Sequence, residues 1–178
     1  SVGVRHACRI EGGELSCWGE NRQGQLGLGD PNERTSPTRV GDGSSWLDVA
    51  AAEEHTCAIA EPGRIYCWGN NLSGQLGTGE SGSQNVPTRV ASTFADFERV
   101  FAGGDSTCAF RGGGSLYCWG ATGQLLAGTG DVVTTQVVDE PIIVLSGSRF
   151  KEVSLGGGHA CAVRNDGALL CWGQNTDG

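Results

Sequence analysis

Cysteine and histidine are the residues of this chain whose types and spacing suggest chemistry. The eight cysteines fall into four pairs, with partners nine or ten positions apart, and a histidine or serine stands two positions before each pair. The pairs are Cys8 and Cys17, Cys57 and Cys67, Cys108 and Cys118, and Cys161 and Cys171, preceded by His6, His55, Ser106 and His159. Thiolate and imidazole groups bind metals, and facing cysteines form disulfide bonds. The choice between these depends on the elements that hold the side chains.

The cysteine pairs belong to a longer repeat. Each second cysteine is followed by Trp-Gly, and the copies recur with a period of roughly 51 residues, which is typical of solenoids and propellers. An aromatic residue, a valine and a run of small residues precede the last three pairs, as in Trp46, Val49 and residues 50–52. Small side chains suit strands crowded around a central axis. The repeat divides the chain approximately into residues 1–40, 41–90, 91–144 and 145–178, with both ends inside a repeat.

Composition and charge narrow the class of protein. The 178 residues include 31 glycines, which indicate many tight turns and short strands, so we expect an all-β fold. The net charge is −8, and Lys151 is the only lysine. Nucleic-acid binding is therefore not expected, because it needs a basic patch. No apolar run is long enough to span a membrane.

The cysteine pairs define hairpins. If Cys57 lies opposite Cys67, residues 61–63 form a three-residue loop that ends in Gly63, as a type I turn followed by a left-handed residue requires. The same register leaves residues 112–114 and 165–167 as loops in the third and fourth repeats. In the first repeat the loop shortens to Gly12 and Gly13, which suit a primed turn. One register therefore accounts for all four copies.

This register predicts four disulfide bonds, one within each pair. Directly opposed residues of antiparallel strands have Cα atoms about 4.5 to 5.5 Å apart, which a disulfide can bridge. The alternative is that the cysteines are reduced and act as small buried hydrophobes. A zinc site is weakly supported, because no Cys-x-x-Cys knuckle is present. Disulfide bonds would place the protein in an oxidising compartment: extracellular, cell-surface or periplasmic.

The motif Cys-Trp-Gly-x-Asn-x-x-Gly-Gln-Leu-Gly-x-Gly resembles the regulator-of-chromosome-condensation repeat. Residues 17–29 and 67–79 carry it in full, residues 118–130 shift the Gly-Gln-Leu and lose the Asn, and residues 171–175 begin it. The resemblance implies a β-propeller of four-stranded blades. Residues 1–178 would form a single partial propeller of 3.5–4 repeats, about half of a seven-bladed ring. The remainder of the ring or another chain is expected to cover its open edges. A kelch propeller is the alternative fold.

We expect no catalytic residue, cofactor or metal in this chain, and therefore no enzyme. The sequence contains no Ser-His-Asp order, phosphate loop or HExxH motif. A ring of histidines around a metal is weakened by Ser106, and the simpler expectation is that each histidine bonds to the backbone of a neighbouring blade. The tryptophans that follow the second cysteines are expected in the core.

Variable loops are the expected binding sites, because propeller blades hold such loops rigidly. The candidate loops are residues 30–36, 80–86 and 131–140. The candidate contact residues within them are Asp30, Glu33, Arg34, Glu80, Gln84, Asp131, Val132 and Val133. The apolar content of the third loop, up to residues 141–144, favours an inserted strand over a contact surface. Asn71 begins a glycosylation sequon, which has meaning only in a secreted eukaryotic chain.

Three functions remain open from the sequence. The first is a protein-binding or scaffold module outside the cytosol, whose partner the sequence does not name. The second is a structural component of a multi-chain surface or extracellular assembly. The third is guanine-nucleotide exchange, which the resemblance allows but which takes place in a reducing nucleus and so conflicts with disulfide bonds. Light sensing is disfavoured, because sensing members of the family carry tryptophans beside the repeat histidine, where this chain has Arg5, Glu54 and Gly158.

Overall fold

The computed structural model describes residues 1–41, 43, 45–121, 137–145 and 150–173, which form fourteen strands and no helix. No helix of this described part could therefore cross a membrane. The strands are β1 (His6–Glu11), β2 (Glu14–Gly19), β3 (Arg34–Arg39), β4 (Trp46–Ala51), β5 (His55–Ala60), β6 (Arg64–Gly69), β7 (Gln84–Arg89), β8 (Phe97–Gly103), β9 (Ser106–Arg111), β10 (Ser115–Gly120), β11 (Val138–Leu145), β12 (Phe150–Leu155), β13 (His159–Arg164) and β14 (Leu169–Gly173).

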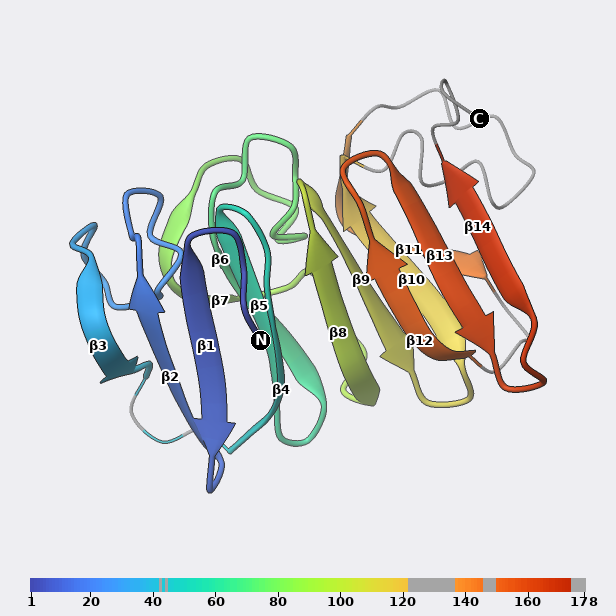
Figure 1. The fold of residues 1–178 in the computed structure, drawn as a ribbon, viewed down its shortest axis with the longest axis horizontal. Coiled ribbons are helices and arrows are strands. Elements are labelled where there is room, and N and C mark those ends of the chain that lie inside the picture. Colours follow the sequence, from blue (N-terminus) through green and yellow to red (C-terminus); the bar gives the residue numbers. More distant parts are fainter. Residues whose placement is uncertain (42, 44, 122–136, 146–149, 174–178) are drawn as a thin grey trace.

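The strands form four antiparallel sheets, one for each repeat. We call them blade 1 (β1–β3), blade 2 (β4–β7), blade 3 (β8–β11) and blade 4 (β12–β14). Within each blade, strands that follow one another in the sequence are hydrogen-bonded neighbours. Figure 1 shows the blades side by side in sequence order, as in an open arc of a propeller. The predicted all-β, partial-propeller fold is confirmed.

The hairpin register is the one expected from the cysteines. Cys57 lies opposite Cys67, and Ala60 opposite Arg64, so that residues 61–63 form the loop. Residues 112–114 and 165–167 form the corresponding loops of blades 3 and 4. In blade 1 the two-residue loop has positive φ angles at both glycines, 58° at Gly12 and 82° at Gly13, as a type I′ turn requires.

The first strands of blades 2, 3 and 4 lie against one another and line the inner side of the arc. Small residues are needed there because the backbones approach closely. A Cβ atom on Gly103 of β8 would come 2.4 Å from the carbonyl oxygen of Leu155 in β12. This agrees with the expected role of the small residues before each histidine position.

Each blade turns its tryptophan towards the preceding blade and its disulfide towards the following one. Trp68 and Trp119 therefore lie between blades and are fully buried, as expected of core residues. Trp18 faces the open side of blade 1, and Trp172 lies in blade 4; both are only half-buried. The alternation of side chains along a strand thus gives every blade two different faces.

The apolar segment of the third repeat forms a strand, as favoured by the sequence. β11 is the outermost strand of blade 3, and its pairing with β10 is interrupted by register shifts. Val138 and Val144 are buried against the blade. Val132 and Val133, in the same candidate loop, lie outside the described residues.

Candidate functional site

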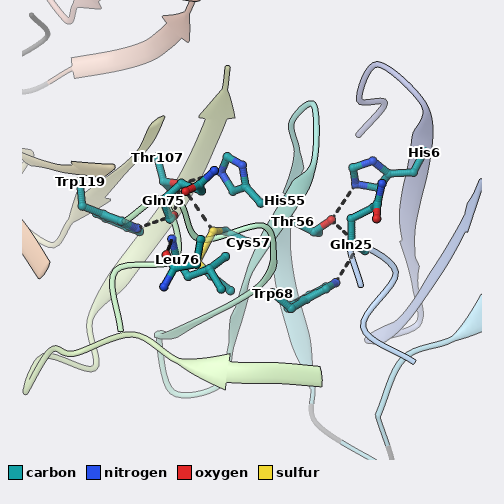
Figure 2. The surroundings of a disulfide bond; sticks show 12 residues. His6, Gln25, His55, Thr56, Cys57, Trp68, Gln75, Leu76, Thr107 and Trp119 are labelled. Atoms are coloured by element: carbon teal, nitrogen blue, oxygen red, sulfur yellow. Dashed lines mark hydrogen bonds between the residues drawn. A yellow bond between two sulfur atoms is a disulfide. The ribbon is translucent and has the colours of Figure 1, made fainter. Parts of the chain in front are cut away.

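Two of the junctions between blades are each built around one backbone carbonyl. At the junction of blades 1 and 2, the carbonyl oxygen of Gln25 accepts hydrogen bonds from Thr56 Oγ1 at 2.8 Å and from Trp68 Nε1 at 2.9 Å. Figure 2 shows Gln25 reaching from blade 1 to these two side chains of blade 2. Two donors from the next blade thus share an acceptor supplied by the Gly-Gln-Leu-Gly motif.

The junction of blades 2 and 3 repeats this arrangement. The carbonyl oxygen of Gln75 accepts hydrogen bonds from Thr107 Oγ1 at 2.9 Å and from Trp119 Nε1 at 3.0 Å (Figure 2). Gln75, Thr107 and Trp119 are all fully buried. Because buried polar groups need partners, the repetition makes these bonds a structural requirement of the repeat.

A histidine completes each of these two junctions. His6 Nε2 lies 2.7 Å from Thr56 Oγ1, and His55 Nε2 lies 2.9 Å from Thr107 Oγ1. Each threonine hydroxyl gives its single proton to the glutamine carbonyl, so the imidazole Nε2–H must be the donor to the threonine oxygen. The contact is with the neighbouring blade, as expected, but with a threonine hydroxyl and not with the backbone.

Burial keeps both imidazoles neutral. Desolvation lowers the pKa of His6 from 6.5 to about 4, with Glu20 acting weakly in the opposite direction. Desolvation, helped by His6, lowers the pKa of His55 to about 3. The Nδ1 atoms of both rings are buried without a hydrogen-bond partner. Protonation of Nδ1 would place a charged, unpaired donor in the interior, so burial disfavours the charged form of both rings.

Polar residues that recur in the repeat fix the loop before the last strand in blades 1 and 2. In blade 1, Asn21 Nδ2 donates to the carbonyl oxygens of Asp30 and Asn32, and its Oδ1 accepts from the Leu26 amide at 2.9 Å. Gly27 follows with a φ of 72°, and a Cβ atom there would come 2.8 Å from the indole nitrogen of Trp68. The motif therefore packs one blade's loop onto the next blade's tryptophan.

Asn71, the predicted glycosylation site, is the corresponding residue in blade 2. Its side chain is 4% exposed, Nδ2 donates to the Glu80 carbonyl at 2.7 Å, and Oδ1 accepts from the Leu76 amide at 3.0 Å. A glycan on Nδ2 would have to break the bond to Glu80 and bring the amide to the surface. The position thus serves loop structure in this fold, and glycosylation would compete with it.

The four cysteine pairs are disulfide-bonded in the expected pattern, within the middle hairpin of each blade. The disulfides of blades 1, 2 and 3 are buried, because the following blade covers them. In blade 4, Cys161 is partly exposed and Cys171 is exposed. Cys57 also touches the next junction, with Sγ 3.7 Å from Thr107 Oγ1 (Figure 2).

The long loops of blades 1 and 2 lie at the same edge of the arc, which is the upper edge in Figure 1. We call this edge the loop rim and define it as residues 20–33, 52–54, 70–83, 104–105 and 137–140. The loops at the rim contact the neighbouring blade: the Gly29 amide donates to Asn85, and the Gly79 amide to Asp139. The rim is therefore continuous from blade to blade.

Some of the predicted contact residues are exposed at this edge, whereas others are engaged in an ion pair or in a strand. Asp30 and Arg34 form an ion pair at 2.7 Å, and the hydrogen bond from Arg34 lowers the pKa of Asp30. Glu33 and Glu80 are exposed, whereas Gln84 begins β7 and pairs with Gly69. Asp131, Val132 and Val133 lie outside the described residues.

Sequence reasoning missed Leu72, which projects from the β6–β7 loop with 85% of its surface exposed. The signal was present, because a leucine occupies a loop position where the first repeat has Arg22. Sequence reasoning also missed Asp48, whose Oδ2 accepts from the Val100 amide of the next blade at 2.9 Å. That residue links the inner strands β4 and β8.

The loop rim of blades 2 and 3 is acidic, whereas the opposite edge of blades 2 to 4 carries both signs of charge. On the loop rim, the described residues of blades 2 and 3 contribute only acidic side chains: Glu53, Glu54, Glu80, Asp105, Asp139 and Glu140. The basic residues of blades 2 to 4 lie at or near the opposite ends of their strands, where acidic residues accompany them: Arg64, Arg89, Arg99, Arg111, Lys151 and Arg164, with Glu61, Asp96, Glu98, Glu152 and Asp166. A partner at the loop rim of blades 2 and 3 would therefore meet negative charge.

The site offers binding geometry rather than reactive groups. Among the described residues, no three histidine, cysteine or acidic side chains gather where they could hold a metal ion. The cysteines are oxidised, and the two buried histidines are engaged at blade junctions. The loop rim presents to solvent a set of fixed loops with one exposed leucine, Leu72, and several carboxylates.

Comparison with known proteins places this arrangement in a family. A model described as "Regulator of chromosome condensation (RCC1) repeat" matches residues 12–59 and 62–110, and a second model of that repeat matches residues 46–75 and 150–178. The chain is 37% identical to the ultraviolet-B receptor UVR8 of Arabidopsis thaliana, over 100% of this chain and 41% of the receptor. It is 31% identical to the mitochondrial RCC1 domain-containing protein RUG3 of the same plant, over 99% of this chain and 41% of that protein.

Solved structures agree with the fold. Human WBSCR16 superposes with a TM-score of 0.85 at 25% identity, over 98% of this chain and 46% of that chain. Yeast RCC1 (Prp20), in its complex with Kap60, superposes with a TM-score of 0.80 at 22% identity, over 96% of this chain and 42% of that chain. The chain spans less than half the length of these relatives. Because the RCC1 repeat models match more than half of its residues, the chain belongs to the regulator of chromosome condensation (RCC1) repeat family.

Proposed function

We propose that this chain is a protein-binding module of an RCC1-type propeller and that it binds through its loop rim. The observation that carries the proposal is the β6–β7 loop, where Leu72 is 85% exposed although the loop itself is pinned by the buried Asn71 and Gln75. A rigid loop loses little conformational entropy on binding, and an exposed apolar side chain on it gains by burial. No chemistry is required of such a site.

The charge distribution indicates the kind of surface that would bind. Carboxylates share the loop rim with this loop, and Glu53, Glu80 and Asp105 are exposed there. A partner with an apolar pocket bordered by basic residues fits this surface, and the charges would speed association. The yeast relative in complex with Kap60 binds a protein partner, but at 22% identity it supports only the fold.

Binding should be tested with charge reversals of equal size at the two edges. Glu80→Lys changes the loop rim, and Glu98→Lys, at the exposed start of β8 on the opposite edge, is the matched control. Immobilised wild-type protein and both variants would be exposed to an extract of the native source at low and moderate salt. A partner held by wild type and by Glu98→Lys, but lost with Glu80→Lys, is the expected result. A partner retained equally by all three proteins would refute the loop rim.

The compartment forms the second part of the proposal. We propose an extracellular, cell-surface or periplasmic location, because disulfide bonds persist in oxidising compartments. Four disulfide bonds in one small arc support this, whereas the name of RUG3 places that relative in mitochondria. Protein taken from the native source under acid quench should bind no thiol-alkylating reagent unless it is first reduced. Alkylation without reduction would refute the location.

A further inference from the structure

The residues at the histidine and threonine positions vary together from junction to junction. Between blades 1 and 2, His6 meets Thr56, and between blades 2 and 3, His55 meets Thr107. Between blades 3 and 4 both residues differ, because Ser106 replaces the histidine and Ala160 replaces the threonine. Ser106 is 3% exposed and Ala160 is fully buried, so this junction is closed to solvent as well.

Hydrogen bonding explains why the two positions should change together. The imidazole Nε2–H needs an acceptor from the next blade, and alanine has none. A histidine opposite alanine would bury a donor without a partner, which is more costly than having neither group. Serine with alanine avoids that cost, because serine is small and can turn its hydroxyl to a nearby carbonyl.

The two open faces of the arc differ at these positions. The open face of blade 4 has the histidine, and the open face of blade 1 has alanine in place of the threonine. His159 of blade 4 lies opposite Gly173, in the same register as His55 opposite Gly69, and its side chain is exposed. Blade 1 has Ala7 at the position of Thr56 and Thr107. A second copy of this chain, stacked head to tail on blade 4, would therefore place Ala7 opposite His159.

We propose that the histidine and threonine positions form a key that selects neighbouring blades, and that the open face of blade 4 takes a blade with threonine at that position. This face corresponds, by its position in the repeat, to the faces of blades 1 and 2 that are filled at the two described junctions, and those junctions indicate the chemistry of its occupant. Blade 1 of a second copy is excluded as the natural occupant, because Ala7 offers no acceptor to His159. The occupant is another blade of this repeat that carries the His-Thr or Ser-Thr dipeptide.

The key can be tested inside the chain by two double-mutant cycles. At the natural junction, His55→Ser, Thr107→Ala and the double variant are compared by urea unfolding. At the junction of blades 3 and 4, Ser106→His, Ala160→Thr and their double variant install the key instead. In each cycle we compare the unfolding equilibrium constant of the double variant with the value expected if the two single substitutions acted independently. We expect the measured constant to be about tenfold smaller than that value. If Ser106→His fails to fold, the natural junction decides the matter. Additive effects at both junctions overturn the key.

The choice of occupant is tested with a second copy as the probe. Self-association of wild type, Ala7→Thr and Ala7→Thr with His159→Ser would be measured by sedimentation over a range of concentrations. We expect Ala7→Thr to associate about fivefold or more tightly than wild type, and the added His159→Ser to cancel the gain. The same association by all three chains, whether weak or strong, overturns the selection of threonine by His159.

Discussion

Acid should destabilise this protein well above the pH at which its carboxylates titrate, because two neutral histidines hold its blade junctions. The unfolded chain has histidine pKa values near 6.5, whereas the folded values are about 4 for His6 and about 3 for His55. Below pH 6.5 these two histidines become protonated in the unfolded chain but stay neutral in the folded chain. Stability is therefore complete above pH 6.5 and falls as the pH drops from about 6.5 towards the folded pKa values.

The size of this effect at pH 5 depends little on the folded pKa values, because both lie at least one unit lower. Each histidine is then about 1.5 units below its unfolded pKa, which corresponds to about 2 kcal/mol. The two together should reduce the free energy of unfolding by about 4 kcal/mol between pH 8 and pH 5. The hydrogen bond from Arg164 lowers the pKa of Asp166 to about 2. The contribution of this carboxylate to the stability of the folded protein is therefore lost only below this pH range.

Urea unfolding followed by tryptophan fluorescence at pH 8, 6.5 and 5 measures the effect, since Trp68 and Trp119 are buried at the junctions. His6→Gln with His55→Gln should remove most of the pH dependence, because an amide can donate to threonine without titrating. The exposed His159, changed to glutamine, is the control and should leave the dependence intact. An undiminished loss of stability in the double variant would refute the assignment to these two rings.

Three further predictions follow from the packing. Gly77→Ala should cost about 3 kcal/mol or more, because φ is +64° and the new Cβ would lie 2.6 Å from an indole, whereas Gly157→Ala meets nothing within 4 Å and should be nearly neutral in urea unfolding. Asn71→Ala should cost about 2 to 4 kcal/mol by the same assay, because one backbone amide and one carbonyl lose their partner. Under mild reductant with alkylation and mass spectrometry, Cys161–Cys171 should open first, since it alone is exposed; a buried pair opening earlier would contradict this.

Local features of the fold were predictable from the sequence. The spacing of Cys57 and Cys67, with a glycine at the end of the loop, defines a hairpin over eleven residues, and short-range turn chemistry leaves one register. Four copies, one with a two-residue loop and three with a three-residue loop, then test that register independently. The disulfide pattern follows from the same alignment, because only facing positions can be bridged.

The junction chemistry was not predictable in the same way. His6 and Thr56 are 50 positions apart, and their contact depends on how two blades stack. The repeat did contain a signal, since Ser106 and Ala160 depart from the pattern together. Asn71 was read as a sequon although Asn21 occupies the same position in the repeat, where it ties the loop to its own backbone.

The confinement of every disulfide to a single hairpin has a mechanical consequence. Each bond spans nine or ten positions within one blade, and none connects two blades. Under tension applied at the ends, the blades can separate from one another while every hairpin stays closed. About ten residues, or roughly 35 Å of contour length, are withheld from extension in each blade. Reducing agents should therefore lengthen the fully stretched chain in steps of about 35 Å, one for each hairpin that opens.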